Sequence, residues 1–438
     1  MKTLLITFKV LFLLVVLIVS LISGAIIEKF GIFPISDRVN YFIMEIPFVE
    51  RIKTKLKWSV LDATKGEISD KTVFSNNLIL NFQQFKAPSA RKYGGIEIIS
   101  DRLFYVDGEG KGWIKDGDNF QLVLDDPIPS NSKIFEETHT VAESYLFGVK
   151  DILVSSYLKS DYLLISTNNY NAVEECYYLS VFKKKISYES EAPLFNEPWV
   201  NLFNSSPCIK SKNGKLFDGT SSGGRLINSE PGKVFFSTGD FYFDGVNDER
   251  LSPKSDYSKV FEFSFLNKED PKVIGSGFRN PQGLVKVGNG LFETEHGPQG
   301  GDELNFISLD SEEVKDYGWP DATYGVDYGK FEWPFDKNNS NHQEKGFVLP
   351  KMSWIPSIGT SNLILIEQNN FKGWKDNLLI GTLRDKSLYR VVLNGSEVSA
   401  IERINIEIRS RDILESSKGV FILEDSNPPN IWEMTPSN

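Results

Sequence analysis

The chain has 438 residues, of which 40% are apolar and 13% aromatic, so it can bury one large core or two to three small ones. Its formal net charge of -11 argues against nucleic acid or an anionic lipid surface as the main partner. The many aromatic residues beside only 4 methionines are typical of β structure.

The first 27 residues predict a membrane anchor or a signal peptide. An unbroken apolar run extends from Val10 to Ile27, and Lys2 and Lys9 precede it. A run of this length can just span a bilayer, and lysines before it favour a cytoplasmic N-terminus. The small residues 23–25 offer a cleavage site, so secretion is the alternative. Either outcome exports the rest to the periplasmic or extracellular side, with residues 28–85 as a stalk and lead-in strands.

The chain has two cysteines, Cys176 and Cys208. In an exported protein such a pair can form one disulfide. Two separate thiols are the alternative, and neither cysteine fits a metal-binding motif.

From Gly94 onward, apolar strands alternate with turns rich in Gly, Asp, Asn and Pro, and no long amphipathic helix separates them. This pattern predicts an all-β fold, and six strong strands over residues 86–438 indicate a six-bladed β-propeller. A strand at residues 78–82 would complete the last blade; a large β-sandwich or a β-helix is the alternative. The six strong strands are expected to begin near Leu103, Leu163, Val234, Leu291, Leu378 and Val420.

Two polar clusters rich in Gly and Pro occupy residues 279–283 and 295–303. Such loops hold the backbone in fixed conformations, so their carbonyls and side chains can converge on a ligand. In a propeller, the loops that enter the innermost strands meet at one mouth. Residues far apart in the sequence can therefore share one site.

Four motifs resemble those of the soluble quinoprotein sugar dehydrogenases, the glucose/sorbosone (aldose) dehydrogenase family. They are GFRNPQGL at 277–284, EHGPQGGDELN at 295–305, YGWP at 317–320 and RSRD at 409–412. The resemblance covers roughly Tyr93 to the C-terminus. It independently implies a six-bladed propeller, pyrroloquinoline quinone (PQQ) and calcium as cofactors, and hydride transfer from an aldose or related sugar to the quinone.

PQQ carries three carboxylates and an electrophilic quinone, and arginine suits carboxylates because its planar fork bonds two oxygens. By resemblance, Arg279 and Asn280 face the quinone oxygen that becomes negative during reduction, an oxyanion-type role. A surface or strand-pairing role is the alternative for any one arginine. The cofactor contacts implied in this way are Arg279, Asn280, Gln282, Trp354, Arg384, Arg409 and Arg411.

Calcium prefers oxygen ligands, including the backbone carbonyls of turns. By resemblance, the carbonyls of Gly297 and Pro298 hold the cofactor-bound calcium, which acts as a Lewis acid on the quinone. Asp302 and Glu303, with Tyr317, resemble a second, structural calcium site; a solvated acidic turn is the alternative. Calcium rarely takes nitrogen ligands, so we expect a hydrogen-bonded structural role for His296.

The family takes the proton from the sugar hydroxyl with a histidine just before a Gly-Arg pair. The matching segment here, FDGTSSGGR at 217–225, contains no histidine. Ser221 or Thr220 falls at that position, but a hydroxyl is a poor base near neutral pH. Asp218 can replace the base if it is desolvated, and an ordinary Asp-Gly turn is its alternative. Phe278, where the family often has histidine, makes the pocket edge more apolar.

Three functions therefore stay open. The first is a sugar dehydrogenase with a displaced base, which we prefer as the single assignment because the cofactor residues are retained. The second is a binding module that keeps cofactor or calcium without the chemistry, and the third is a calcium-dependent sugar lactone hydrolase. The four arginines among the implied cofactor contacts favour the first two functions, since a lactonase does not need to bind a tricarboxylate. Aromatic residues within 324–350 either stack on sugar rings or pack between blades. The sequence does not identify the electron acceptor.

Overall fold

The computed structural model describes residues 70–89, 93–138, 148–189, 192–210, 219–241, 254–267, 270–326 and 342–437. They belong to one compact unit, Ser69–Asn438. The predicted anchor or signal segment and most of the predicted stalk lie outside these ranges. Within the ranges, no helix is long and apolar enough to cross a membrane.

Within the described ranges the strands form six sheets, which are the blades of a propeller. Blade 1 consists of β3 (Gly94–Ile99), β4 (Arg102–Asp107), β5 (Gly112–Asp116) and β6 (Asn119–Leu124). The short helix α4 (Ser132–Thr138) follows it. Blade 2 consists of β7 (Val149–Tyr157), β8 (Ser160–Asn171) and β9 (Cys176–Glu189), and β9 also pairs with β10 (Ala192–Leu194), β11 (Val200–Asn204) and β12 (Ile209–Lys210).

Blades 3 to 5 follow in chain order. Blade 3 consists of β13 (Gly223–Asn228), β14 (Lys233–Thr238), β15 (Lys259–Ser264) and β16 (Lys272–Ser276), with β20 (Lys315–Asp316) parallel to β16. Blade 4 consists of β17 (Pro281–Val287), β18 (Gly290–Glu295), β19 (Asp302–Ser308) and β21 (Met352–Trp354). Blade 5 consists of β22 (Thr360–Leu365), β23 (Leu378–Thr382), β24 (Ser387–Asn394) and β25 (Glu397–Asn405).

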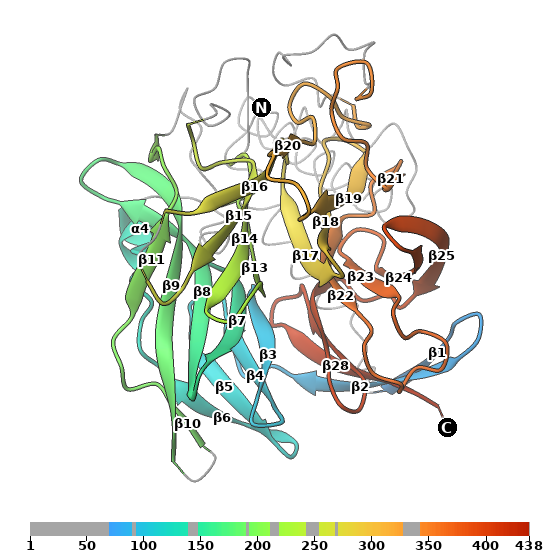
Figure 1. Ribbon diagram of the computed structural model, residues 1–438. Helices are drawn as coiled ribbons and strands as arrows, with labels where there is room; N and C mark the ends of the chain where they lie inside the picture. The colour runs from blue at the N-terminus through green and yellow to red at the C-terminus, as the bar shows by residue number, and fades with distance from the viewer. Residues whose placement is uncertain are drawn as a thin grey trace, which may run out of the picture. The chain divides into compact units, whose positions relative to one another are not determined.

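Blade 6 joins both ends of the described chain. It consists of β26 (Ser410–Glu415), β27 (Val420–Glu424), β28 (Asn430–Pro436), β2 (Ile79–Lys86) and β1 (Asp70–Phe74). β2 pairs with β28 in antiparallel register, for example Phe82 opposite Met434. Figure 1 shows β1 and β2 in blue, with β2 beside the red C-terminal strand β28. The predicted completion of the last blade by an N-terminal strand is therefore confirmed.

The innermost strands close a ring around a central channel. Each contacts the innermost strand of the next blade, in the order β3, β7, β13, β17, β22, β26 and back to β3. The labels of β3, β7, β13, β17 and β22 lie near the centre of Figure 1. All six strong strands predicted from the sequence are the second strands of blades: β4, β8, β14, β18, β23 and β27.

The second strands are apolar because both faces of each blade pack against neighbouring blades. In β14, for example, Val234, Phe235 and Phe236 are all fully or nearly fully buried. Phe236 belongs to the core shared with blade 2, whereas Phe235 packs with residues of blade 4. A continuous apolar run is the pattern expected of a strand buried on both faces.

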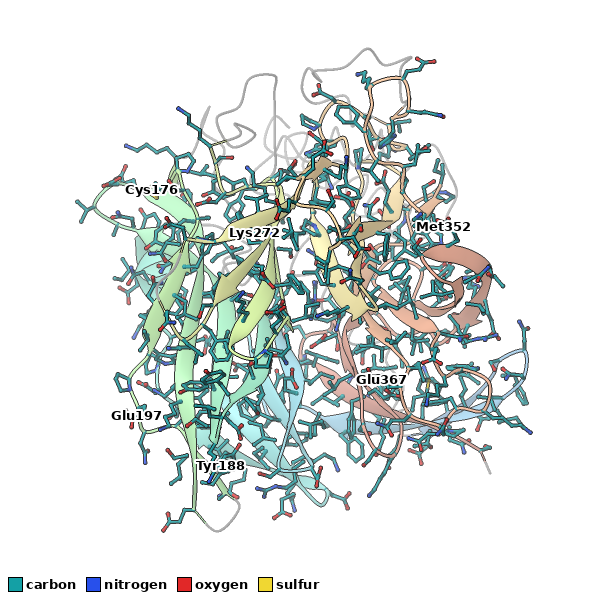
Figure 2. The ribbon with its side chains drawn as sticks, viewed as in Figure 1. Cys176, Tyr188, Glu197, Lys272, Met352 and Glu367 are labelled. Atoms are coloured by element: carbon teal, nitrogen blue, oxygen red, sulfur yellow. A yellow bond between two sulfur atoms is a disulfide. The ribbon has the colours of Figure 1, made fainter. Side chains whose placement is uncertain are left out.

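Cys176 and Cys208 form a disulfide, with their Cα atoms 5.5 Å apart. Of the two alternatives left open by the sequence, the structure therefore contains the bonded pair. The bond links the start of β9, where Figure 2 labels Cys176, to the segment just before β12.

Candidate functional site

The innermost strands all begin at one end of the channel, which we call the mouth. Hydrogen bonds between blades join the residues there. The backbone N–H of Gly223 in blade 3 donates to Oδ1 of Asn280 in blade 4, at 3.2 Å. The imidazole Nε2 of His296 lies 2.5 Å from the carbonyl oxygen of Thr360 in blade 5. The mouth therefore brings loops from different blades into contact, as the sequence predicts.

Five of the six innermost strands break register just after they begin. The breaks lie in β7, β13, β17, β22 and β26, whereas β3 pairs with β4 without a break. A bulge leaves a residue unpaired and re-aims its side chain. The predicted ligands Gln282 and Arg411 both occupy such breaks. The residues within the five breaks are Lys150, Gly224, Arg225, Gln282, Ser361, Asn362 and Arg411.

Arg279 is fixed at the mouth through both its backbone and its side chain. Its backbone N–H donates to Oε2 of Glu295 at 2.5 Å. Its Nη1 donates to the carbonyls of His296 at 3.0 Å and Gly297 at 2.8 Å. Its Cζ lies 5.5 Å from the centre of the Trp319 ring. The guanidinium of Arg279 is thus held beside the carbonyl that the sequence assigns to calcium.

Asn280 and Gln282 lie next to Arg279 and to each other. Nε2 of Gln282 donates to Oδ1 of Asn280 at 2.8 Å. Ser221 lies on the neighbouring blade, where its carbonyl accepts the N–H of Phe241 at 2.8 Å. The predicted residues Arg279, Asn280, Gln282 and Ser221 therefore share one region of the mouth.

Arg409 and Arg411 approach the mouth from blade 6 and share one carboxylate. Nη2 of Arg409 lies 2.8 Å from Oδ2 of Asp425, and Nη2 of Arg411 lies 3.5 Å from Oδ1 of Asp425. Nη1 of Arg411 also donates to Oε1 of Gln282 at 3.4 Å, which connects blade 6 to blade 4. Nε of Arg411 is buried and has no hydrogen-bond partner among the described residues.

Two other predicted cofactor residues have different surroundings. Arg384 is exposed in the turn after β23, and Arg409 donates to the carbonyl of the preceding residue, Leu383, at 2.9 Å. Trp354 is buried and packs edge-on against Tyr389, with ring centres 5.9 Å apart, in the core of blades 4 and 5. The side chain of Trp354 thus contributes to packing between blades.

Asp302 and Glu303 have different roles in the structure. Oδ2 of Asp302 accepts the backbone N–H groups of Gly359 at 2.6 Å and Thr360 at 3.3 Å. Asp302 therefore anchors the loop that enters blade 5. Glu303 instead lines a small cavity. The cavity is lined by Arg279, Glu295, Gly297, Glu303, Tyr317, Trp319, Ala322 and Thr323.

Beside this cavity, three buried glutamates on β18 and β19 surround one amide. Nδ2 of Asn305 lies 3.1 Å from Glu293, 3.3 Å from Glu295 and 3.4 Å from Glu303. Burial, followed by repulsion from Glu295, holds the pKa values of Glu293 and Glu303 well above their ordinary range. Burial raises the pKa of Glu295 to about 7. In the described ranges, no group of three or more His, Cys, Asp or Glu residues has a metal-binding arrangement.

Two other predicted metal ligands, Gly297 and Tyr317, also line this cavity. Tyr317 donates its hydroxyl to the carbonyl of Phe306 at 2.7 Å. A Cβ at Gly297 would lie 2.1 Å from the carbonyl oxygen of Gly301, so only glycine fits there. Pro298 packs against Gly325, where an added Cβ would lie 2.6 Å from the proline ring.

Some predicted residues lie outside the described ranges. Asp218, the candidate base, is one of them, and residues 327–341 of the aromatic segment are others. His342 is buried and stacks on Tyr324 with ring centres 4.9 Å apart. Its Nε2 lies 4.0 Å from Oε1 of Glu303.

Sequence reasoning missed Lys150 and Asp240. Nζ of Lys150 donates to the carbonyl of Gly219 at 2.9 Å and lies 5.3 Å from the centre of the Tyr93 ring. Oδ2 of Asp240 accepts from Nε1 of Trp319 at 3.1 Å, and thus orients the ring that Arg279 contacts. The available signals were a lysine inside an apolar strand and an aspartate directly after one.

Known proteins share this architecture. A soluble aldose sugar dehydrogenase from Escherichia coli, solved in the apo-form, superposes with a TM-score of 0.66 at 19% identity, over 82% of this chain and 100% of that chain. The PQQ-bound aldose sugar dehydrogenase from Streptomyces coelicolor gives a TM-score of 0.55 at 16% identity, over 81% of this chain and 98% of that chain. These likenesses establish the propeller fold.

Two relatives found by sequence share a higher identity with this chain than these two structures do. Aldose sugar dehydrogenase YliI of Escherichia coli (strain K12) is 29% identical over 244 residues, which is 51% of this chain and 62% of the relative. An uncharacterized protein of Synechocystis sp. is 31% identical over 164 residues, which is 36% of this chain and 38% of the relative. The chain thus matches less than two thirds of the length of either relative.

The family described as glucose/sorbosone dehydrogenase matches residues 137–433. This span runs from just after blade 1 into the last strand of blade 6 and includes every predicted site residue. The chain belongs to the glucose/sorbosone dehydrogenase family.

Proposed function

We propose that this protein oxidises an aldose or a related sugar at the mouth of the propeller, with PQQ and calcium as cofactors. The observation that carries the proposal is the convergence of Arg279, Arg409 and Arg411 with Asn280 and Gln282, from blades 4 and 6. Family membership and a PQQ-bound relative of the same fold support it. Bound PQQ supplies an electrophilic quinone that accepts hydride.

The donor set suits a ligand with several carboxylates. Arg409 is held by Asp425 through both Nη2 and Nε, at 2.8 and 3.3 Å, so its planar fork has a fixed direction. Nε of Arg411 is a buried donor that none of the described residues accepts. A buried donor without a partner is costly, and a ligand carboxylate satisfies it. Arg409, Arg411 and Arg279 are therefore the residues we assign to the cofactor.

Calcium suits the cavity beside them. The cavity is lined by Glu295, Glu303 and Gly297, and calcium binds carboxylate and carbonyl oxygens. Burial raises the pKa values of both glutamates, which supports the proposal that the site favours neutralisation of its negative charge. A divalent cation supplies that neutralisation in place of protons. We assign Glu303, with Glu295, to calcium, and leave Asp302 to the loop it anchors.

Calcium is expected to raise the melting temperature of the protein, and Glu303→Gln is expected to abolish the rise. Calcium at about 100 times its dissociation constant contributes about 2.7 kcal/mol of stability if it binds only the folded state. The measurement is thermal unfolding with calcium and with a chelator. The control is Glu313→Gln, because Glu313 is exposed and pairs with Lys315 on the surface. Equal calcium responses in wild type and Glu303→Gln contradict the assignment.

A binding module that keeps the cofactor without the reaction is the second candidate. It is favoured by the histidine missing from segment 217–225, where Ser221 stands. Ser221 and Asp218 remain the proposed substitutes for the base. Hydrolysis of a sugar lactone explains less, because it leaves Arg279, Arg409 and Arg411 without a role.

An absorption spectrum of the exported domain, reconstituted with PQQ and calcium, separates these functions. The spectrum is recorded before and after addition of a panel of aldoses. Reduction of the bound cofactor by a sugar is the expected result. Bound cofactor that no sugar reduces favours the binding module. Failure to bind PQQ overturns the cofactor assignment.

A further inference from the structure

A network of buried polar side chains crosses the central channel beneath the mouth. Nη1 of Arg225 on β13 lies 2.7 Å from Oδ1 of Asp151 on β7 and 3.1 Å from Oδ1 of Asp412 on β26. Nε of Arg225 donates to the backbone carbonyl of Gln282 on β17 at 3.0 Å. One guanidinium thus joins the innermost strands of blades 2, 3, 4 and 6.

Asp412 extends the network to the remaining two blades. Its Oδ1 accepts from Nδ2 of Asn362 on β22 at 2.7 Å, and its Oδ2 accepts the backbone N–H of Ile96 on β3 at 3.1 Å. The side chains of Arg225, Asp151 and Asp412 are 8% exposed or less. Buried charges are stable only with good geometry and satisfied hydrogen bonds, and this network supplies both.

The network holds the register breaks that aim the mouth residues. Asp151 and Asp412 are the first paired residues after the breaks in β7 and β26, and Gln282 is the unpaired residue of the break in β17. The residues skipped beside the two aspartates are Lys150 and Arg411. A bulge keeps its direction only if the extra residue is held in place. Arg225 therefore contacts the break in β17 through the carbonyl of Gln282. It contacts the breaks in β7 and β26 through the carboxylates of Asp151 and Asp412.

From Gln282 the network continues upward to the mouth. Its side-chain amide donates to Oδ1 of Asn280 at 2.8 Å, and its Oε1 accepts from Nη1 of Arg411 at 3.4 Å. Arg225 does not contact these two residues itself. It acts on them through the backbone carbonyl of Gln282.

We propose that Arg225 is a positioning residue for the ligand-binding mouth. It sets the direction of Gln282, and through Gln282 that of Asn280 and Arg411. This inference rests on the proposed cofactor site. Lysine at position 225 keeps the charge, but a single ammonium on a flexible stem cannot reproduce a planar fork that meets two carboxylates and a carbonyl.

The test compares Arg225→Lys with Arg390→Lys. Arg390 is a matched control: Nε lies 2.7 Å from Oε2 of Glu402, Nη1 donates to Asn377 at 2.8 Å, and the residue lies on β24, away from the innermost strands. PQQ affinity is measured by quenching of tryptophan fluorescence in saturating calcium, and melting temperature is measured without PQQ. Loss of a supporting contact typically costs about 10- to 100-fold in affinity or activity.

The expected result is a PQQ dissociation constant raised about tenfold or more in Arg225→Lys and unchanged in Arg390→Lys, at comparable losses of melting temperature. An unchanged dissociation constant in Arg225→Lys overturns the positioning role. If Arg225→Lys does not fold, Asp412→Asn replaces it, because asparagine keeps the shape and removes one carboxylate from the network.

A ligand-free crystal structure of the variant separates this inference from the proposed function. If wild type binds no PQQ, the cofactor assignment fails, but the positions of Gln282 and Arg411 still decide the role of Arg225. Displacement of both side chains in Arg225→Lys supports the inference. Side chains that stay in place overturn it.

Discussion

Replacing Arg279 by methionine is expected to lower kcat for a sugar substrate by about 10²–10³-fold, the usual effect of removing one donor that stabilises developing negative charge. The guanidinium is fixed before any ligand binds, since the carbonyls of His296 and Gly297 and the Trp319 ring hold it. A donor that is already oriented needs no rearrangement during the reaction. The measurement is steady-state kinetics normalised to bound PQQ, and KM is expected to change less than kcat.

The control for this prediction is Arg403→Met. Arg403 is a half-exposed arginine that forms two hydrogen bonds with Asp385 on blade 5, at 2.6 and 2.9 Å. Exposed ion pairs contribute little to stability, so we expect this variant to keep its activity. Equal kcat values for the two variants mean that Arg279 does not act on the reacting atoms. A lower PQQ occupancy at unchanged kcat assigns Arg279 to binding alone.

The fold was largely predictable from sequence because a propeller buries its second strands on both faces. Runs such as residues 234–238 are too apolar for a strand with a solvated side and too short for a helix. The turns between neighbouring strands predict antiparallel pairing, and six such units indicate a closed propeller. The pairing of β2 with β28 was predictable for the same reason, since the last blade was one strand short.

The site was predictable only in part. The cluster at 279–283 was found because glycine, proline and charge stand where an apolar strand is about to begin, and the segment 409–412 was found because it resembles a family motif. The direction of each side chain was not predictable, since one extra residue in a strand turns the following side chains to the other face. Lys150 and Arg225 lie in such breaks, so the sequence did not show in which direction either side chain points.

Contacts between blades set a second limit. Asp302 and Glu303 are adjacent acidic residues, and the sequence assigned both to calcium. Their roles differ because of the neighbouring blade, where the backbone N–H groups of Gly359 and Thr360 donate to Asp302. Likewise, Trp354 is directed into the core by Tyr389, a residue of the next blade.

The channel also makes stability depend on pH through Glu97 on β3. Burial, with repulsion from Asp151 and Asp412, raises the pKa of Glu97 to about 8 from its ordinary value of 4.5. Arg225 is the one guanidinium of the network facing these three carboxyl groups. The folded protein therefore holds a proton on Glu97 at neutral pH, whereas the unfolded chain releases it. This contribution to stability is complete below about pH 4.5 and is lost as the pH rises through about 8.

Glu97→Gln is therefore expected to flatten the decline in unfolding free energy between about pH 5 and about pH 8.5, and to exceed wild type in stability at the upper end. Each pKa unit between folded and unfolded states is worth about 1.4 kcal/mol, so the gain at high pH is easily measured by urea denaturation in a chelator. Asp151, whose pKa burial raises to about 7, titrates in the same direction and leaves a residual slope. Glu312→Gln, an exposed substitution, is expected to follow the wild-type curve. If unfolding free energy depends on pH in the same way in Glu97→Gln and wild type, Glu97 is ionised in the folded channel. Arg225 then neutralises only part of the negative charge of Glu97, Asp151 and Asp412.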